Sequence, residues 1–153
     1  MVKSVLIVMK HLDYGGMERN TLNLANAMVD KGIAVTVISG DGPLSNRFSP
    51  NVNLFILPIS RNLRIKQITE KRILEIAAVC KPQIIHTQCR MALVCSQLAR
   101  KTLNIPLVTH EHRMYADPDA YPYIVNELKE CADKIIAIGP YTARELVING
   151  LKK

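Results

Sequence analysis

The sequence predicts an α/β fold, a doubly wound parallel sheet of about six strands with helices on both faces. Short apolar runs alternate with longer segments in which apolar residues recur at helical spacing, as in repeated strand–helix units. The first run, "SVLIVM" at 4–9, is almost wholly apolar, as expected of a parallel strand buried on both faces. With 153 residues, 48% of them hydrophobic, the chain suits a single domain, residues 1–153, with its own core.

Each element has a local signal. Leu22, Ala25 and Val29 recur at helical spacing and stop before Gly32, which suits the end of a helix. Pro140 suits a first helical turn, where its missing N–H loses no hydrogen bond. We expect, in chain order, a strand at 4–9, a helix at 17–31, strands at 33–39 and 53–58, a helix at 63–80, a strand at 82–87, a helix at 90–103, a strand at 106–112, a helix near 123–131, a strand at 133–139 and a helix from Pro140 to Gly150.

Composition narrows the class of protein. The net charge of +7 is compatible with an anionic partner, but two Phe, five Tyr and no Trp leave few rings for stacking on bases, so we expect no nucleic-acid ligand. No apolar run approaches the length of a membrane span, and the first run is too short for a signal peptide. The four cysteines form no Cys-x-x-Cys pair, which favours a reduced, cytoplasmic setting.

Polar residues collect where the predicted strands end. In a doubly wound sheet, ligands bind at the carboxyl ends of the strands, where the strand order reverses. Two adjacent glycines after the first strand can adopt positive φ and let another molecule approach the backbone. The residues at these strand ends are Gly15, Gly16, His86, Gln88, His110, Glu111 and His112.

The double glycine matches neither common nucleotide loop. The segment "GGMERN" lacks the later glycines of a G-x-G-x-x-G fingerprint, and no Gly-Lys-Ser/Thr follows it. A zinc site formed by the histidines and Cys89 is disfavoured, because His-x-His is the only short-spaced ligand pair. We therefore expect no metal and no cofactor.

Four ordered segments nevertheless resemble one enzyme family. The segments "GGMERNTLNLANAMVDKGIAVTVIS", "KPQIIHTQ", "IPLVTHEH" and "CADKIIAIGPYTARELV" are similar to successive motifs of the retaining glycosyltransferases of family 4, whose fold is called GT-B. The chain departs from the family pattern at Ile33, Gln83 and Gly139, where His, Asp and Ser are usual. The matches span nearly the whole chain.

The resemblance implies a function and roles for residues. It implies the Rossmann-like, acceptor-side N-terminal domain of an enzyme that transfers a sugar from a nucleotide-diphosphate sugar to a glycan or lipid-linked acceptor. A C-terminal domain, absent from this chain, would hold most of the donor, so the fragment alone should be inactive. The family's active-site histidine falls at His112, with His110 on the same strand face as the alternative. The donor diphosphate would lie near Gly15, Gly16, Glu18, Arg19 and His86.

The predicted helix at 63–80 carries two kinds of side chain. Its apolar stripe should face the core through Ile65, Ile68, Ile73, Ile76 and Ala77. Its basic residues are Arg61, Arg64, Lys66, Lys71 and Arg72. They form either an ordinary solvated face or a contact with an anionic membrane surface.

A rival function from another class stays open at this point. A doubly wound domain of this kind could also be a stand-alone module that binds an anion or a nucleotide without chemistry, because fold alone does not decide function.

Overall fold

The computed structural model describes residues 1–112 and 120–152 and shows the predicted fold. Its six strands form one sheet in the order β3-β2-β1-β4-β5-β6, and every neighbouring pair is parallel. The strands are β1 (Ser4–Val8), β2 (Ala34–Ser39), β3 (Asn53–Ile56), β4 (Ile84–Thr87), β5 (Leu107–Glu111) and β6 (Lys134–Ala137).

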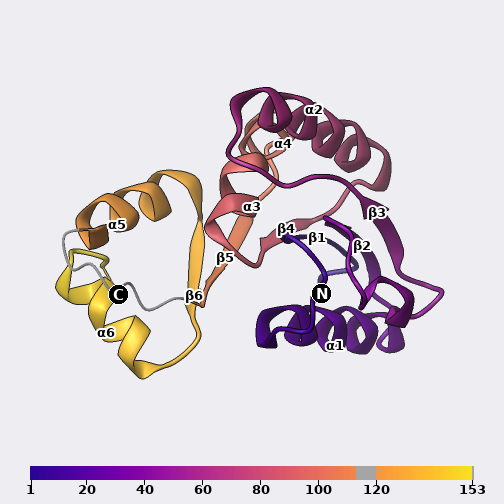
Figure 1. The fold of residues 1–153 in the computed structure, drawn as a ribbon, viewed down its shortest axis with the longest axis horizontal. Coiled ribbons are helices and arrows are strands. Elements are labelled where there is room, and N and C mark those ends of the chain that lie inside the picture. The colour runs from indigo at the N-terminus through magenta and orange to yellow at the C-terminus, as the bar shows by residue number, and fades with distance from the viewer. Residues whose placement is uncertain (113–119, 153) are drawn as a thin grey trace.

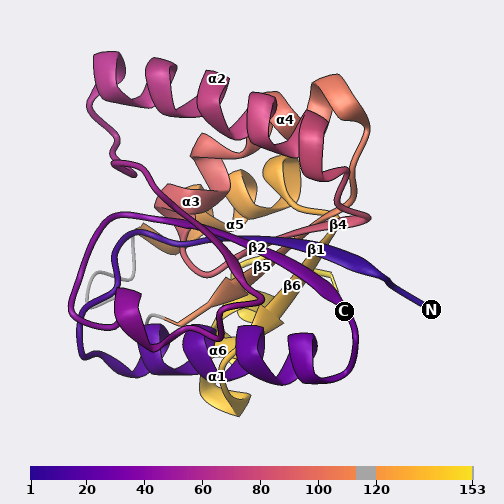
Figure 2. The same ribbon diagram turned by 90° about the vertical axis from the view of Figure 1, so that its right-hand side faces the viewer.

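Helices cover both faces of this sheet. Figures 1 and 2 show α1 and α6 on one side and α2, α3, α4 and α5 on the other. The helices are α1 (Gly16–Asp30), α2 (Leu63–Cys80), α3 (Arg90–Cys95), α4 (Gln97–Leu103), α5 (Ala120–Cys131) and α6 (Pro140–Ile148), with a short 3-10 turn at Ser45–Arg47. Within the described residues, no helix is both long and apolar enough to span a bilayer.

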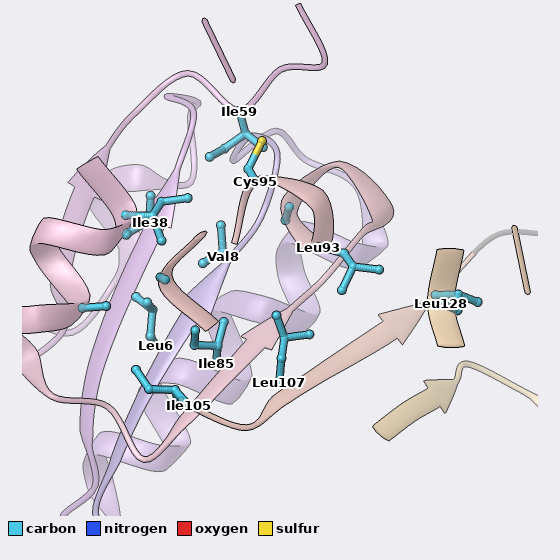
Figure 3. Close-up of a cluster of buried hydrophobic side chains, with 14 of the residues drawn as sticks. Leu6, Val8, Ile38, Ile59, Ile85, Leu93, Cys95, Ile105, Leu107 and Leu128 are labelled. Carbon is cyan, nitrogen blue, oxygen red and sulfur yellow. The ribbon is translucent and has the colours of Figure 1, made fainter. Parts of the chain in front are cut away.

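The apolar strands divide their side chains between two cores. In β1, Leu6 and Val8 are buried against the α2–α5 side, whereas Val5 and Ile7 are buried with residues of β2 and α1. Figure 3 shows the first core, where Leu6 and Val8 lie among side chains from neighbouring strands and α3. Burial on both faces explains why the first strand shows no polar alternation.

Glycine ends α1 as predicted. Gly32 has φ of 77°, its N–H donates to Val29 O, and Ile33 N–H donates to Met28 O. This pattern satisfies the last carbonyl groups of the helix with a left-handed residue just after it.

The predicted helix at 90–103 is two helices. The chain breaks at Ser96, whose hydroxyl donates to Ala92 O at 2.8 Å. Gln97 Nε2 donates to Leu93 O and to Cys131 O, so α3 is tied across to α5 at the break. The spacing of apolar residues predicts the helical conformation but not this interruption. A hydrogen bond from a serine hydroxyl to the backbone does not change that spacing.

The predicted core stripe of α2 is wrong at two positions. Ile73, Ile76 and Ala77 are buried, but Ile65 is 37% exposed and Ile68 is 64% exposed. The structure buries Thr69 instead, with its hydroxyl donating to Pro58 O at 2.6 Å. The start of α2 therefore presents isoleucine to solvent.

Candidate functional site

A cavity of about 430 Å³ opens at the carboxyl ends of β1, β4 and β5. Because β1 and β4 are the neighbours at which the strand order reverses, the cavity lies at the switch point of the sheet. We call it the switch-point pocket. Its lining residues are Lys10, His11, Met17, Glu18, Arg61, Gln88, Cys89, Arg90, Met91, Glu111 and His112.

The two glycines form the start of α1 without positive φ. Gly15 is the residue before the helix, with φ of −69°, and Gly16 is the first helical residue. Neither glycine uses the positive φ that glycine can adopt, since among the described glycines only Gly32 and Gly150 do. A Cβ on Gly15 would overlap Glu18 Oε2, whereas a Cβ on Gly16 would meet nothing within 4 Å.

Glu18 folds back over the start of its own helix. Its side chain is 6% exposed, and Oε1 lies 3.2 Å from His11 Nδ1. Asp13 Oδ2 lies at the same distance from that ring nitrogen. This pairing places the Glu18 carboxylate on the floor of the switch-point pocket, and the small Gly15 makes room for it.

Three histidine rings cluster beside the pocket, and one of them lines it. The ring centroids of His86 and His110 are 5.9 Å apart, and those of His110 and His112 are 4.4 Å apart. His112 lies just past β5 and lines the pocket, whereas His86 and His110 do not. The structure thus puts the favoured histidine of the sequence prediction at the cavity wall.

Gln88 orients the His112 ring. His112 Nε2 lies 3.2 Å from Gln88 Oε1, and Gln88 itself is fully buried. Because an amide oxygen only accepts hydrogen bonds, this contact is a hydrogen bond in the tautomer that carries its proton on Nε2. The unprotonated Nδ1 is then the acceptor, suited to a hydroxyl group.

Burial keeps these imidazoles neutral. Desolvation, followed by the neighbouring His110 and His112, lowers the pKa of His86 from 6.5 to about 4. Desolvation also lowers the pKa of His110, and desolvation followed by the charge of His110 lowers the pKa of His112. At neutral pH all three rings act as hydrogen-bonding groups rather than as cations.

The predicted site residues separate into three groups. Glu18 and His112 line the pocket together. Gly15 and Gly16 are exposed beside it at the start of α1, and Arg19 is exposed on that helix. His86 and His110 lie in the histidine cluster described above.

Sequence analysis missed several lining residues. Lys10 and His11 follow β1 directly, and Arg90 begins α3 just after β4. The strand-end rule that selected Gln88 and Glu111 applies equally to them. No sequence motif distinguishes these three residues, because each is a single lysine, histidine or arginine outside any recognised pattern.

The basic segment divides between pocket and surface. Arg61 lines the pocket. Lys66 pairs with Glu70 at 3.1 Å, and Arg72 pairs with Glu75. Arg64 and Lys71 are exposed on α2.

Among the described residues, no three His, Cys, Asp or Glu side chains are grouped as metal ligands. The cysteines among them are all free thiols. The pocket lining includes imidazole, carboxylate, amide and guanidinium groups, which can form hydrogen bonds.

Sequence comparison identifies the class of this chain. The sequence model of Glycosyltransferase Family 4 matches residues 14–153, so the chain belongs to that family. A search of curated protein sequences finds no significant match.

Solved structures share the fold. HepE from Anabaena, crystallised with UDP and glucose, is 18% identical, and the similarity covers 99% of this chain and 42% of HepE with a TM-score of 0.75. A glycosyltransferase from Rickettsia africae is 24% identical over 92% of this chain and 38% of its own, with a TM-score of 0.72. A UDP-N-acetylglucosamine 2-epimerase from Rickettsia bellii is 13% identical. The similarity covers 99% of this chain and 43% of the epimerase, with a TM-score of 0.69.

These likenesses establish the architecture, the Rossmann-like half of a GT-B enzyme. The chain spans about two fifths of the length of each of these structures. Transferases and an epimerase share this half, so its fold alone does not choose between their reactions.

Proposed function

We propose that this chain is the acceptor-side domain of an enzyme that transfers a sugar from a nucleotide-diphosphate sugar to an acceptor with retention. The observation that carries the proposal is the switch-point pocket of a family 4 chain, with His112 at its wall and Glu18 on its floor. A cavity of this size at the switch point of a doubly wound sheet, with charged, amide and imidazole groups beside Met17 and Met91, suits a sugar-sized ligand.

The donor meets this domain at the start of α1. Free N–H groups at the beginning of a long helix favour an anion, and the exposed Gly15 and Gly16 allow close approach. HepE, which shares the fold, was crystallised with UDP-glucose. We propose that a second, C-terminal domain holds most of the donor and that the diphosphate reaches Gly15, Gly16 and Arg19 on closure.

His112 orients the sugar that is transferred. Its Nδ1 accepts a hydrogen bond from a sugar hydroxyl, while Gln88 fixes the ring through Nε2. A neutral imidazole is required, since protonation of Nδ1 would remove the acceptor. His110 packs against this ring at a tilt and His86 stacks on His110, so both support the ring rather than touch the sugar.

No metal ion takes part in the proposed reaction. Stabilisation of the leaving diphosphate falls to backbone N–H groups and cationic side chains. Activity that survives EDTA is therefore expected.

A membrane-bound acceptor is the finer part of the proposal. The exposed start of α2 combines Leu63, Ile65 and Ile68 with the cations Arg64 and Lys71. Apolar side chains beside lysine and arginine suit the interface of an anionic bilayer. We propose that the protein acts in the cytoplasm, at the membrane surface, on a lipid-linked acceptor.

Nucleotide release tests the proposed reaction. The full-length protein should release nucleoside diphosphate from at least one of UDP-glucose, UDP-N-acetylglucosamine, GDP-mannose and ADP-glucose when extracted lipids or glycans are added. Product analysis should show the anomeric configuration of the donor retained. Tight binding without release of nucleotide would instead support the stand-alone binding module.

A further inference from the structure

The loop between β1 and α1 carries a histidine to which the proposed function gives no role. His11 lines the switch-point pocket, and its side chain is 34% exposed. The Nδ1 atom of its ring is nevertheless buried. The ring nitrogen of His11 that remains for a ligand in the pocket is therefore Nε2.

Two carboxylates lie against the buried nitrogen. Glu18 Oε1 and Asp13 Oδ2 are each 3.2 Å from His11 Nδ1. The Glu18 side chain is 6% exposed, whereas that of Asp13 is 64% exposed, so water and salt screen the contact with Glu18 less. Neither contact is aligned as a hydrogen bond, which is common in active sites to which no substrate is bound.

These carboxylates favour a basic Nε2. A carboxylate only accepts hydrogen bonds, so the tautomer of His11 that suits this pair has its proton on Nδ1 and a lone pair on Nε2. When Nε2 takes up a second proton, the imidazolium lies beside two carboxylates, which stabilise its charge. A carboxylate that orients an imidazole and stabilises its charged form is the arrangement in which histidine acts as a general base.

The segment that follows β2 holds the backbone around His11 in place. Gly40 N–H donates to Lys10 O at 3.0 Å. A Cβ on Gly40 would overlap Lys10 O, and a Cβ on Gly42 would overlap Leu12 O. The two segments therefore pack more closely than side chains at these glycines would allow, and His11 is fixed between the two contacts. A catalytic group requires fixed geometry of this kind.

We propose, on the basis of the proposed function, that His11 is the general base of the transfer and that Glu18 positions it. The acceptor hydroxyl gives its proton to His11 Nε2 while its oxygen forms a bond to the anomeric carbon of the donor sugar. The bond between that carbon and the diphosphate breaks, and its electron pair leaves with the diphosphate. The His11 imidazolium then releases the proton to solvent.

The place of His11 in the chain suits retention of configuration. Retention by direct transfer requires that the acceptor attack the face of the sugar from which the diphosphate leaves. His11 lies in the loop between β1 and α1, and Gly15 and Gly16, near which we place the diphosphate, are at the end of the same loop. A base and a leaving group that share one loop can reach the same face of the sugar.

Steady-state kinetics of the full-length protein test the base. The probes are the nucleotide-sugar that the protein turns over and the extracted lipid or glycan that stimulates nucleotide release. His11→Gln should lower kcat by about 10²-fold or more, because a general base contributes about 10²–10⁴-fold. The KM for the acceptor and the affinity for UDP should stay close to their native values, since a base acts in the transition state rather than in binding.

A double-mutant cycle tests the positioning role of Glu18. Glu18→Gln should lower kcat, although by less than His11→Gln does. In the His11→Gln background the same substitution should lower kcat no further, because Glu18 acts through the ring that has been removed. The matched control is Glu130→Gln, which changes an exposed carboxylate of α5 to an amide and should leave kcat unchanged in both backgrounds.

Chemical rescue provides a test that does not depend on His11→Gln. Imidazole added to His11→Ala should restore part of the lost rate. Pyrazole, a ring of the same size but a much weaker base, should not. Equal effects of imidazole and pyrazole would refute the base.

The outcomes separate this inference from the proposed reaction. A normal kcat in His11→Gln would retain the transferase and refute the base. A fall in kcat that is matched by an equal loss of acceptor or UDP affinity would assign His11 to binding and also refute the base. Additive losses in the double variant would refute the positioning role of Glu18. A native protein that releases no nucleotide from any of the donors would refute the proposed reaction itself.

Discussion

The two glycines at the start of α1 differ in what a methyl group would meet. In Gly15→Ala, the new Cβ would overlap Glu18 Oε2, so the carboxylate must leave its position beside His11. In Gly16→Ala, the new Cβ meets nothing within 4 Å, and the residue is already helical. One substitution therefore disturbs the pocket floor, and the other changes only the exposed surface.

The magnitudes follow from these contacts. Moving Glu18 off its rotamer costs about 0.5–1.5 kcal/mol, and loosening its contact with His11 adds to that cost. A destabilisation of about 1–2 kcal/mol corresponds to a fall in Tm of about 2–8 °C for a domain of this size. Gly16→Ala should leave Tm unchanged or raise it slightly, because alanine restricts the unfolded chain.

Calorimetry and donor kinetics on the full-length protein provide the assay. Gly16→Ala should keep its Tm and lose about tenfold or more in kcat/KM for the nucleotide-sugar, because the methyl group blocks approach of the diphosphate to the backbone. The Tm loss of Gly15→Ala should shrink in a Glu18→Ala background, where no carboxylate is displaced. Full activity in a stable Gly16→Ala protein would show that the glycine serves only the helix start, and an unchanged Tm loss in the double variant would refute the Glu18 argument.

Three further predictions concern pH, membrane and metal. Unfolded His86 takes up a proton below about pH 6.5 and folded His86 resists protonation to about pH 4, so the free energy of unfolding should fall as pH falls through that window. His86→Leu should flatten this dependence, and an unchanged pH profile from urea titrations would refute it. Paired Arg64→Gln and Lys71→Gln substitutions should weaken co-sedimentation with anionic vesicles at low salt, and equal binding to neutral vesicles would contradict a charge-dependent contact. Nucleotide release should persist in excess EDTA, and its loss with recovery on adding Mg²⁺ or Mn²⁺ would contradict a metal-free reaction.

The sequence predicts the positions of the strands along the chain well, because parallel strands that are buried on both faces need continuous apolar runs. The same logic places Gln88, Glu111 and His112 at one edge of the sheet, where the structure finds all three at the pocket. Strand ends are local features that converge through topology, so a correct fold class brings them together without knowledge of side-chain packing.

Other features depend on packing between distant segments. The contact of Arg90 with Glu127 joins residues 37 positions apart and depends on where α5 docks. On α2, the sequence allows burial either of the isoleucine stripe or of a stripe that includes Thr69. The structure buries Thr69, whose hydroxyl donates a hydrogen bond to Pro58 O. The overlap above Gly15 arises from the rotamer of Glu18, which no sequence pattern specifies.

The central claim is that sugar transfer takes place at the switch-point pocket, with His112 at the reacting sugar. The most direct measurement compares kcat and Tm for His112→Ala and His110→Ala in the full-length protein with its best donor and acceptor. We expect His112→Ala to lower kcat by about 10²-fold or more while Tm changes by a few degrees at most, and His110→Ala to retain most of its activity. A near-normal rate in His112→Ala beside an inactive, folded His110→Ala would contradict the account and move the reaction away from this pocket wall.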